Sequence, residues 1–209
     1  MSRPAEGLYD EKQSFTYEDY AAWPDTPRYE LIEGDAVKLE TPSQAHQAML
    51  IELGTQFANF LRGKKCKVFL TPFDVRLNHK TLDNTVVQPD LLVVCDKDKL
   101  NGRHCLGAPD MVAEIISPST VRKDKIRKFN LYQQAGVTEF WILDPTSRVV
   151  TVHILQDGRY TTTYYSDTDT INVHVLEDCE ITLSDVFEDA PPPEPEKAFP
   201  PELLLSDHA

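Results

Sequence analysis

Three side chains suited to metal and phosphate chemistry lie in the middle of the chain. Asp90 stands at the mouth of the apolar run Leu91–Cys95. Glu114 interrupts a second apolar run, Met111–Ile116, and Lys128 follows on a predicted helix. Two carboxylates on neighbouring strands offer the oxygen ligands that Mg²⁺ prefers. An ammonium group beside them can stabilise charge on a phosphate. This set predicts a metal-dependent phosphodiesterase centre.

Glu114 is the most informative of the three because it is the only charge in an apolar strand. Burying an unpaired carboxylate is costly, so a buried glutamate is normally paired or bound to a metal. A structural salt bridge is the simpler alternative for Glu114. A solvated turn residue is the simpler alternative for Asp90. The residues alone leave both alternatives open.

A helix is expected from residue 119 or 120 to Gly136, and its faces decide where Lys128 points. At about 100° per residue, Asp124, Lys128 and Tyr132 share one partly apolar face. Lys128 should therefore face the sheet. Asp124 precedes it by one turn, which is the favourable order for an ion pair. Lys125 is the next candidate for the amine, since it points about 60° away.

Two further polar residues lie on other predicted elements. Glu30 belongs to a hairpin of residues 29–33 and 36–40, with a type II′ turn expected at Gly34-Asp35. It faces away from Leu31, either as a further acidic member of the site or as an ordinary half-exposed residue. His46 lies near the start of the helix predicted over residues 43–62. A packed or capping role is the simpler interpretation of His46, and a functional role is the alternative.

The order of elements predicts an α/β fold. Antiparallel strands followed by one crossover helix indicate a mixed β-sheet flanked by helices, with additional β-hairpins. Residues 1–187 are expected to form one domain, with a core at about 15–155 and C-terminal strands within 149–183. Residues 188–209 are rich in proline and acids, so they are expected to be a disordered tail.

Composition limits the partners and the location. The net charge is -13, which argues against tight nonspecific binding to duplex DNA without excluding a basic patch. No apolar run approaches the roughly 18 residues of a membrane span, and no signal peptide is evident, so we expect no membrane association and a cytoplasmic protein. The cysteines lack Cys-x-x-Cys spacing and are expected to be buried thiols.

Several segments resemble known families. Pro89-Asp90 with Glu114-Ile115-Ile116 resembles the motif of the PD-(D/E)XK nuclease superfamily, although Ile116 stands where that motif usually has lysine. Lys128 fits the branches in which the lysine lies on the next helix. Residues 29–34, 108–120 and 124–145 resemble the Uma-two family of restriction-endonuclease-like proteins.

The resemblance implies a restriction-endonuclease-like core, often in a homodimer. It assigns Asp90 and Glu114 as metal ligands, Lys128 as the catalytic lysine and Glu30 as an extra acid. The leading hypothesis is therefore an endodeoxyribonuclease that uses Mg²⁺ or Mn²⁺, held also by the Ile115 carbonyl, and acts on DNA. A nonenzymatic protein-interaction module is the alternative. A phosphodiesterase acting on a smaller nucleotide or on RNA is a weaker third hypothesis.

Overall fold

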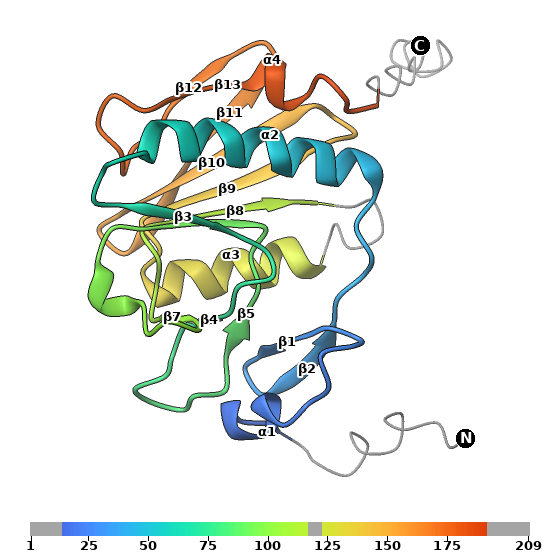
Figure 1. The fold of residues 1–209 in the computed structure, drawn as a ribbon, viewed down its shortest axis with the longest axis vertical. Helices are drawn as coiled ribbons and strands as arrows, with labels where there is room; N and C mark the ends of the chain where they lie inside the picture. Colours follow the sequence, from blue (N-terminus) through green and yellow to red (C-terminus); the bar gives the residue numbers. More distant parts are fainter. Residues whose placement is uncertain (1–13, 117–122, 192–209) are drawn as a thin grey trace, which may run out of the picture.

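The computed structural model describes residues 14–116 and 123–191, with side chains from residue 126 onward in the second range. Figure 1 shows two main layers, one around a six-stranded sheet and one around a five-stranded sheet, with the chain passing between them. A two-stranded sheet completes the described part of the fold.

The six-stranded sheet has the strand order β11-β10-β9-β8-β6-β3. Its β8 and β9 are parallel and are joined through helix α3, while the other neighbours are antiparallel. Parallel neighbours need such a crossover connection. The predicted mixed sheet with one crossover helix is therefore confirmed. The elements of this layer are β3 (Lys67–Leu70), β6 (Leu91–Val94), β8 (Met111–Ile115), α3 (Lys123–Ala135), β9 (Glu139–Asp144), β10 (Val149–Gln156) and β11 (Arg159–Ser166).

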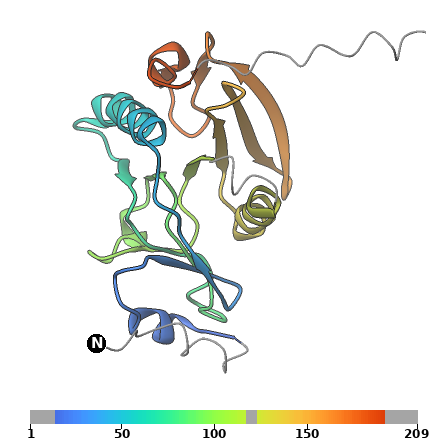
Figure 2. The ribbon, with the colours of Figure 1, turned by 90° about the vertical axis from the view of Figure 1, so that its right-hand side faces the viewer.

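Helix α2 (Gln44–Leu61) begins at a capping residue and packs on one face of this sheet. The Ser43 hydroxyl accepts a hydrogen bond from the His46 backbone N–H at 3.1 Å, which satisfies one of the free donors of the first turn. Helix α3 covers the opposite face, as Figure 2 shows. The predicted helix over residues 43–62 is confirmed to within one residue at each end.

Strand alternation fixes the direction of Glu114. Its neighbours Ala113 and Ile115 belong to the core cluster on the α2 side, and Val112 belongs to the cluster on the α3 side. Successive side chains of a strand point to opposite faces. Glu114 therefore faces α3, the helix that carries Lys128. Burial on both faces also explains why this strand is otherwise continuously apolar.

The five-stranded sheet has the order β2-β1-β5-β4-β7 and carries Glu30 on β1. Its side chains Ile32, Val75 and Val87 share one hydrophobic cluster with the α3 side of the larger sheet, so the two sheets are joined by a common core. The elements are α1 (Tyr17–Ala21), β1 (Tyr29–Ile32), β2 (Asp35–Lys38), β4 (Val75–Arg76), β5 (Val86–Val87), the 3₁₀ helix η1 (Lys97–Lys99) and β7 (Cys105–Leu106).

The hairpin β1–β2 is confirmed, but its predicted turn is wrong. Ile32 pairs with Asp35, so the loop consists of Glu33 and Gly34. Both residues have positive φ, 53° and 90°, which defines a type I′ turn rather than type II′. Gly34 is the second loop residue because Asp35 already belongs to the strand.

The C-terminal elements lie beside α2 (Figure 1). They are β12 (Thr170–Asn172), β13 (Glu180–Thr182) and α4 (Leu183–Val186). The predicted tail lies outside the described residues from 192 onward. Among the described helices, none is long and apolar enough to cross a membrane.

The cysteine prediction is wrong for one pair. Cys66 and Cys95 form a disulfide between the start of β3 and the end of β6. Lys67 pairs with Val94 in the antiparallel ladder, so the two cysteines are the next opposed pair. Cys105 and Cys179 are free and buried, as predicted.

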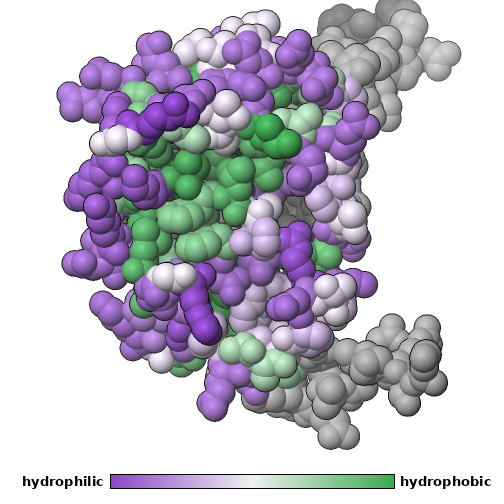
Figure 3. Space-filling view, viewed as in Figure 1, coloured by the Kyte–Doolittle hydropathy of each residue, from purple (hydrophilic) through white to green (hydrophobic). Residues whose placement is uncertain are grey.

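A hydrophobic area occupies the middle of the face seen in Figure 3, where Figure 1 draws α2 and β3. Strand β3 is the edge of the six-stranded sheet, and Leu70 at its end is 36% exposed. Helix α2 comes close to this strand at Gly54. A Cβ on Gly54 would lie 3.0 Å from Leu70 Cδ1, so the absence of a side chain there permits the close approach.

We expect Phe57→Ala to destabilise the fold strongly and Ile51→Ala to leave it nearly unchanged. Phe57 is fully buried, with its ring 6.0 Å from that of Trp141, and truncating such a residue costs about 3–5 kcal/mol. Ile51 lies on the same helix and is 62% exposed, so its truncation should change stability by at most about 0.5 kcal/mol. Urea denaturation measures both. Equal losses in the two variants would contradict the packing described for α2.

Candidate active site

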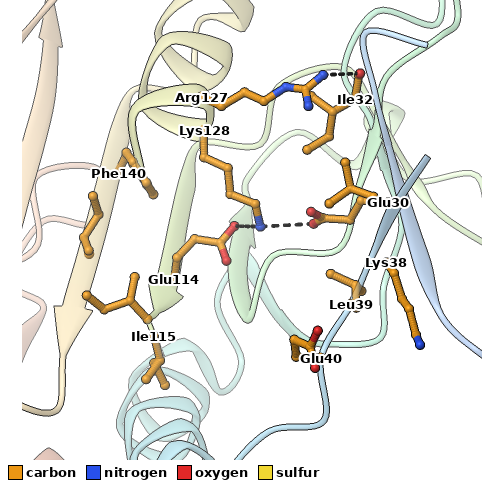
Figure 4. Close-up of a pocket in the computed structure, with 13 residues that line it drawn as sticks. Glu30, Ile32, Lys38, Leu39, Glu40, Glu114, Ile115, Arg127, Lys128 and Phe140 are labelled. Carbon is orange, nitrogen blue, oxygen red and sulfur yellow. Dashed lines mark hydrogen bonds and ion pairs between the residues drawn. The ribbon is translucent and has the colours of Figure 1, made fainter. Parts of the chain in front are cut away.

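Three of the predicted site residues meet at one ammonium group. Lys128 Nζ on α3 lies 2.9 Å from Glu114 Oε1 on β8 and 3.1 Å from Glu30 Oε1 on β1 (Figure 4). All three side chains are at least 85% buried, with exposures of 15%, 12% and 2%. The inward direction expected for Lys128 therefore holds, and Glu30 is a buried member of the group.

The two carboxylate oxygens of Glu114 differ in their hydrogen bonds. Its Oε1 accepts hydrogen bonds from Lys128 Nζ and, at 2.7 Å, from the Tyr132 hydroxyl. Its Oε2 has no hydrogen bond within the described part of the chain, and it is not among the buried unpaired atoms. Lys128 and Tyr132 are one helical turn apart, so both reach the same carboxylate from α3.

The two oxygens of Asp90 also differ in their hydrogen bonds. Its Oδ2 accepts the Ile115 backbone N–H at 2.7 Å and lies 3.1 Å from His46 Nε2. The described residues supply no hydrogen bond to Oδ1. Because a carboxylate only accepts, Nε2 of His46 carries a proton. Its Nδ1 is buried, and no hydrogen-bond partner for it exists in residues 14–116 or in the described part of 123–191.

A cleft of about 760 Å³ opens over these groups. A volume of this size is typical of ligand sites in proteins. The cleft is lined by the first turn of α2, by α3 and by residues on or next to strands of both sheets, among them Arg28, His46, Gln88, Asp90, Glu114 and Lys128. The site therefore lies at the junction of the two sheets, where substrate can reach both carboxylates.

Glu30 is fixed by contacts to two different elements. Its Oε1 accepts the Gln88 backbone N–H at 2.8 Å in addition to Lys128 Nζ. It is 1% exposed, so its charge is balanced by these donors rather than by water. Glu30 therefore positions Lys128 and ties β1 to the segment that leads into Asp90.

Electrostatics in the site are set by three carboxylates around one amine. Burial raises the pKa of Glu114 to about 7; Lys128 opposes this shift, while Asp90 and Glu30 add to it. Burial acts to lower the pKa of Lys128, but Glu114 and Glu30 outweigh it and raise that pKa above its usual range. Lys128 is therefore a permanent cation, suited to stabilising charge and not to accepting a proton. Burial also raises the pKa of Tyr132, so its hydroxyl stays a donor.

The donor set is compatible with a divalent ion of the Mg²⁺ type. Among the described residues, no group of three or more His, Cys, Asp or Glu is arranged to hold a metal. Mg²⁺ keeps several waters and commonly uses only one or two protein carboxylates together with substrate phosphates. The unengaged oxygens of Asp90 and Glu114 meet that smaller requirement, and the negative charge that Lys128 leaves unbalanced favours a cation.

Sequence reasoning missed part of this arrangement. Tyr132 was placed on the correct face of α3, but its hydrogen bond to Glu114 was not predicted; its position one turn after Lys128 was the available signal. The functional alternative for His46 gains support from its contact with Asp90. The side chains of Asp124 and Lys125 lie outside the described residues, so their supporting roles stay predictions.

This fold and the cluster of acids with a lysine define a restriction-endonuclease-like architecture. Residues 17–184 match the model of the Uma2 family, described as "Putative restriction endonuclease". The chain belongs to the Uma2 family, and so to a family of restriction-endonuclease-like nucleases. The resemblance inferred from the motifs is confirmed.

The chain is also similar to two other proteins. An uncharacterized protein of Synechocystis sp., slr1290, is 27% identical over 134 residues, which are 63% of this chain and 69% of the relative. The crystal structure of "a putative nuclease belonging to DUF820" from Anabaena variabilis superposes with a TM-score of 0.69. It is 19% identical and covers 83% of this chain and 98% of its own. At that identity the likeness establishes the fold alone.

We expect the stability of the metal-free protein to depend on pH through Glu114. A carboxyl whose pKa is higher in the folded chain binds more protons there than in the unfolded chain, so stability falls as pH rises between the two values. In EDTA, wild type should lose stability relative to Glu114→Gln between about pH 4.5 and pH 7. The loss is about 1.4 kcal/mol per unit of pKa difference.

Urea denaturation of both proteins across this pH range measures the effect. Glu180→Gln is the matched control, because Glu180 is an exposed residue of β13. Its stability difference from wild type should stay flat. A wild-type protein that gains stability relative to Glu114→Gln as pH rises would contradict the raised pKa.

Proposed function

We propose that this protein is an endodeoxyribonuclease that requires Mg²⁺ or Mn²⁺. Asp90 and Glu114 are the metal-binding carboxylates, the Ile115 carbonyl is a further ligand, and Lys128 is the catalytic amine. The observation that supports this most is the unequal hydrogen bonding of the two oxygens in each carboxylate. Protein donors hold one oxygen of Asp90 and one of Glu114, both residues line the cleft, and the described residues supply no donor to the other oxygen of either.

The chain's own groups divide the work of phosphodiester hydrolysis. A bound divalent ion would supply Lewis acidity and a water of lowered pKa. Lys128, which is held charged, stabilises the negative charge that develops on the scissile phosphate. Tyr132 and Glu30 fix Lys128 and Glu114 in position. His46 and the Ile115 N–H orient Asp90, as hydrogen-bond partners of metal ligands commonly do.

DNA is the proposed substrate, and its binding should be weak or specific to DNA structure. The net charge of -13 opposes association with a phosphate backbone. Arg28 and Lys128 are cations in the cleft, so local attraction exists inside a molecule that repels DNA overall. Such a balance favours substrates that enter the cleft over substrates that bind along a surface.

We further propose a homodimer formed by single-domain subunits of residues 1–187 in the cytoplasm. The shared hydrophobic cluster of the two sheets supports one domain. The apolar, partly exposed edge strand β3 supports association of subunits. The disulfide between Cys66 and Cys95 stands against this location, because a reducing cytoplasm keeps such cysteines as thiols. Light scattering gives the subunit number, and thiol titration of freshly purified protein tests the compartment.

We expect supercoiled DNA to be cleaved in millimolar Mg²⁺ or Mn²⁺ and the activity to depend on all three central residues. Asp90→Asn, Glu114→Gln and Lys128→Met should each lower the cleavage rate by at least about 100-fold, the typical cost of removing one charge-stabilising group. Agarose-gel assays of plasmid relaxation measure the rates. Glu180→Gln, on the exposed side of β13, should cleave like wild type.

Metal titration by calorimetry provides the complementary measurement. Wild type should bind Mg²⁺ or Mn²⁺, and Asp90→Asn should lose that binding. Cleavage that persists unchanged in Asp90→Asn or Glu114→Gln would refute the assignment of these residues. A protein that neither binds the metals at millimolar concentration nor cleaves DNA would instead be a nuclease fold that acts as an interaction module.

A further inference from the structure

A second cleft, of about 500 Å³, lies beside the candidate active site, and four of its lining residues are aromatic. Its volume is within the range of small-molecule sites, about 300–1,000 Å³. Helix α1, the turn after it and the start of β1 form its wall, at the blue end of the chain in Figure 1. The rings are those of Tyr17, Tyr20, Trp23 and Tyr29, and all four residues are half-buried.

The rings form a continuous wall. Trp23 stands between two tyrosines, with ring centroids 5.3 Å from Tyr20 and 5.7 Å from Tyr29, both in edge-to-face contact. Tyr17 extends the row, with its ring 6.3 Å from that of Tyr20. Such contacts hold the rings in place, so the rings lose little conformational entropy when a planar ligand stacks on them. The Arg76 guanidinium lies over the Tyr17 ring, 3.5 Å from its centroid, which leaves Tyr20, Trp23 and Tyr29 as the candidate stacking partners.

This aromatic cleft adjoins the cleft of the candidate active site. Arg28 and Gln88 line both of them. The Gln88 side-chain oxygen accepts a hydrogen bond from the Arg28 guanidinium at 3.3 Å, and its amide donates to the Tyr20 hydroxyl at 3.1 Å. Its backbone N–H is the one that binds Glu30. One residue thus connects the aromatic wall to the acids of the site.

The charged residues that line the aromatic cleft differ from those that line the candidate active site. Arg28 and Arg103 are balanced by Asp25 and Asp74 in the aromatic cleft, so its interior suits a neutral, planar group. Arg28 lies at the boundary between the clefts, where a phosphate would be placed. The Arg103 side chain is exposed, and it has no hydrogen-bond partner in the described part of the structure.

We propose that the aromatic cleft binds an unpaired nucleobase of a nucleic-acid strand whose neighbouring phosphate lies over Asp90 and Glu114. The proposal rests on the proposed function and narrows its substrate to single-stranded or locally unpaired DNA. A base inside a duplex has both faces covered by its neighbours, so it must leave the stack to contact aromatic side chains. Stacking then adds affinity to that supplied by phosphate contacts.

A proline-rich peptide is the other ligand that aromatic clefts commonly bind, and the chain itself contains Pro191-Pro192-Pro193. The shared Arg28 and Gln88 favour the nucleobase, because they place this cleft next to groups that handle phosphate. The experiment therefore compares binding of a proline-rich peptide with binding of an oligonucleotide.

Trp23 is a built-in reporter for this experiment. The chain has two tryptophans, and Trp141 is fully buried in the core, so a change in emission caused by a ligand comes from Trp23. In EDTA at low salt, a short single-stranded oligothymidylate should quench this emission saturably. A blunt, fully paired duplex at the same concentration should not.

Variants on the wall should weaken binding of the single strand. Trp23→Ala and Arg103→Ala are each expected to raise the Kd of a labelled oligothymidylate by at least about fivefold, the lower limit for loss of one stacking partner. Tyr164→Ala and Arg159→Ala are matched controls on β11, where Tyr164 is 71% exposed. Anisotropy gives the Kd values, and circular dichroism verifies folding of each variant.

The outcomes separate this proposal from the nuclease assignment. Saturable quenching by the single strand in a protein that cleaves nothing would support the base-binding cleft and refute the proposed function. Cleavage that needs Asp90 and Glu114, with strand binding unchanged in both Trp23→Ala and Arg103→Ala, would overturn the base-binding cleft alone. Quenching by a peptide of residues 191–202, but not by the oligonucleotide, would also overturn it.

Discussion

A single ammonium group joins the two halves of this molecule. Lys128 binds Glu114 of the six-stranded sheet and Glu30 of the five-stranded sheet at 2.9 and 3.1 Å. Burying an ion pair costs desolvation energy that its attraction barely repays, so this contact is not explained by stability alone. With Asp90 nearby, three carboxylates share one fixed cation. A proton or a second cation would neutralise the surplus negative charge. The charge state of the site therefore depends on pH or on a bound cation.

The hydrogen-bond donors around Asp90 and Glu114 show how the fold prepares such a site. On Asp90 the donors are a backbone N–H of β8 and a ring nitrogen of α2; on Glu114 they are two side chains of α3. Each carboxylate is thus oriented by an element other than its own strand. Partners of this kind fix the direction in which a ligand oxygen points and raise its affinity for a metal. The geometry is specified by packing of α2 and α3 on opposite faces of one sheet.

The sequence predicted local features and failed on distant ones. The single charge in the apolar run Met111–Ile116 and the helical period around Lys128 were enough to predict that both side chains are buried between the sheet and the helix, because each signal depends on one element. The contact of His46 with Asp90 spans 44 residues, and it depends on how α2 crosses the sheet. The disulfide spans 29 residues and depends on the register of β3 against β6, which no local pattern specifies. The type I′ turn was missed by one residue, within the usual uncertainty of element ends.

The acidity of the chain and a nucleic-acid substrate are compatible only if affinity comes from something besides phosphate contacts. Binding to duplex DNA is driven by neutralising phosphates and weakens as the protein becomes more negative. Stacking of an exposed base depends on ring surface and adds to the affinity that phosphate contacts supply. If the aromatic cleft binds a base as proposed, a protein of net charge -13 would gain from unpaired strands an affinity that an intact duplex does not supply. The net charge that opposes binding to any DNA would then favour unpaired strands over duplex.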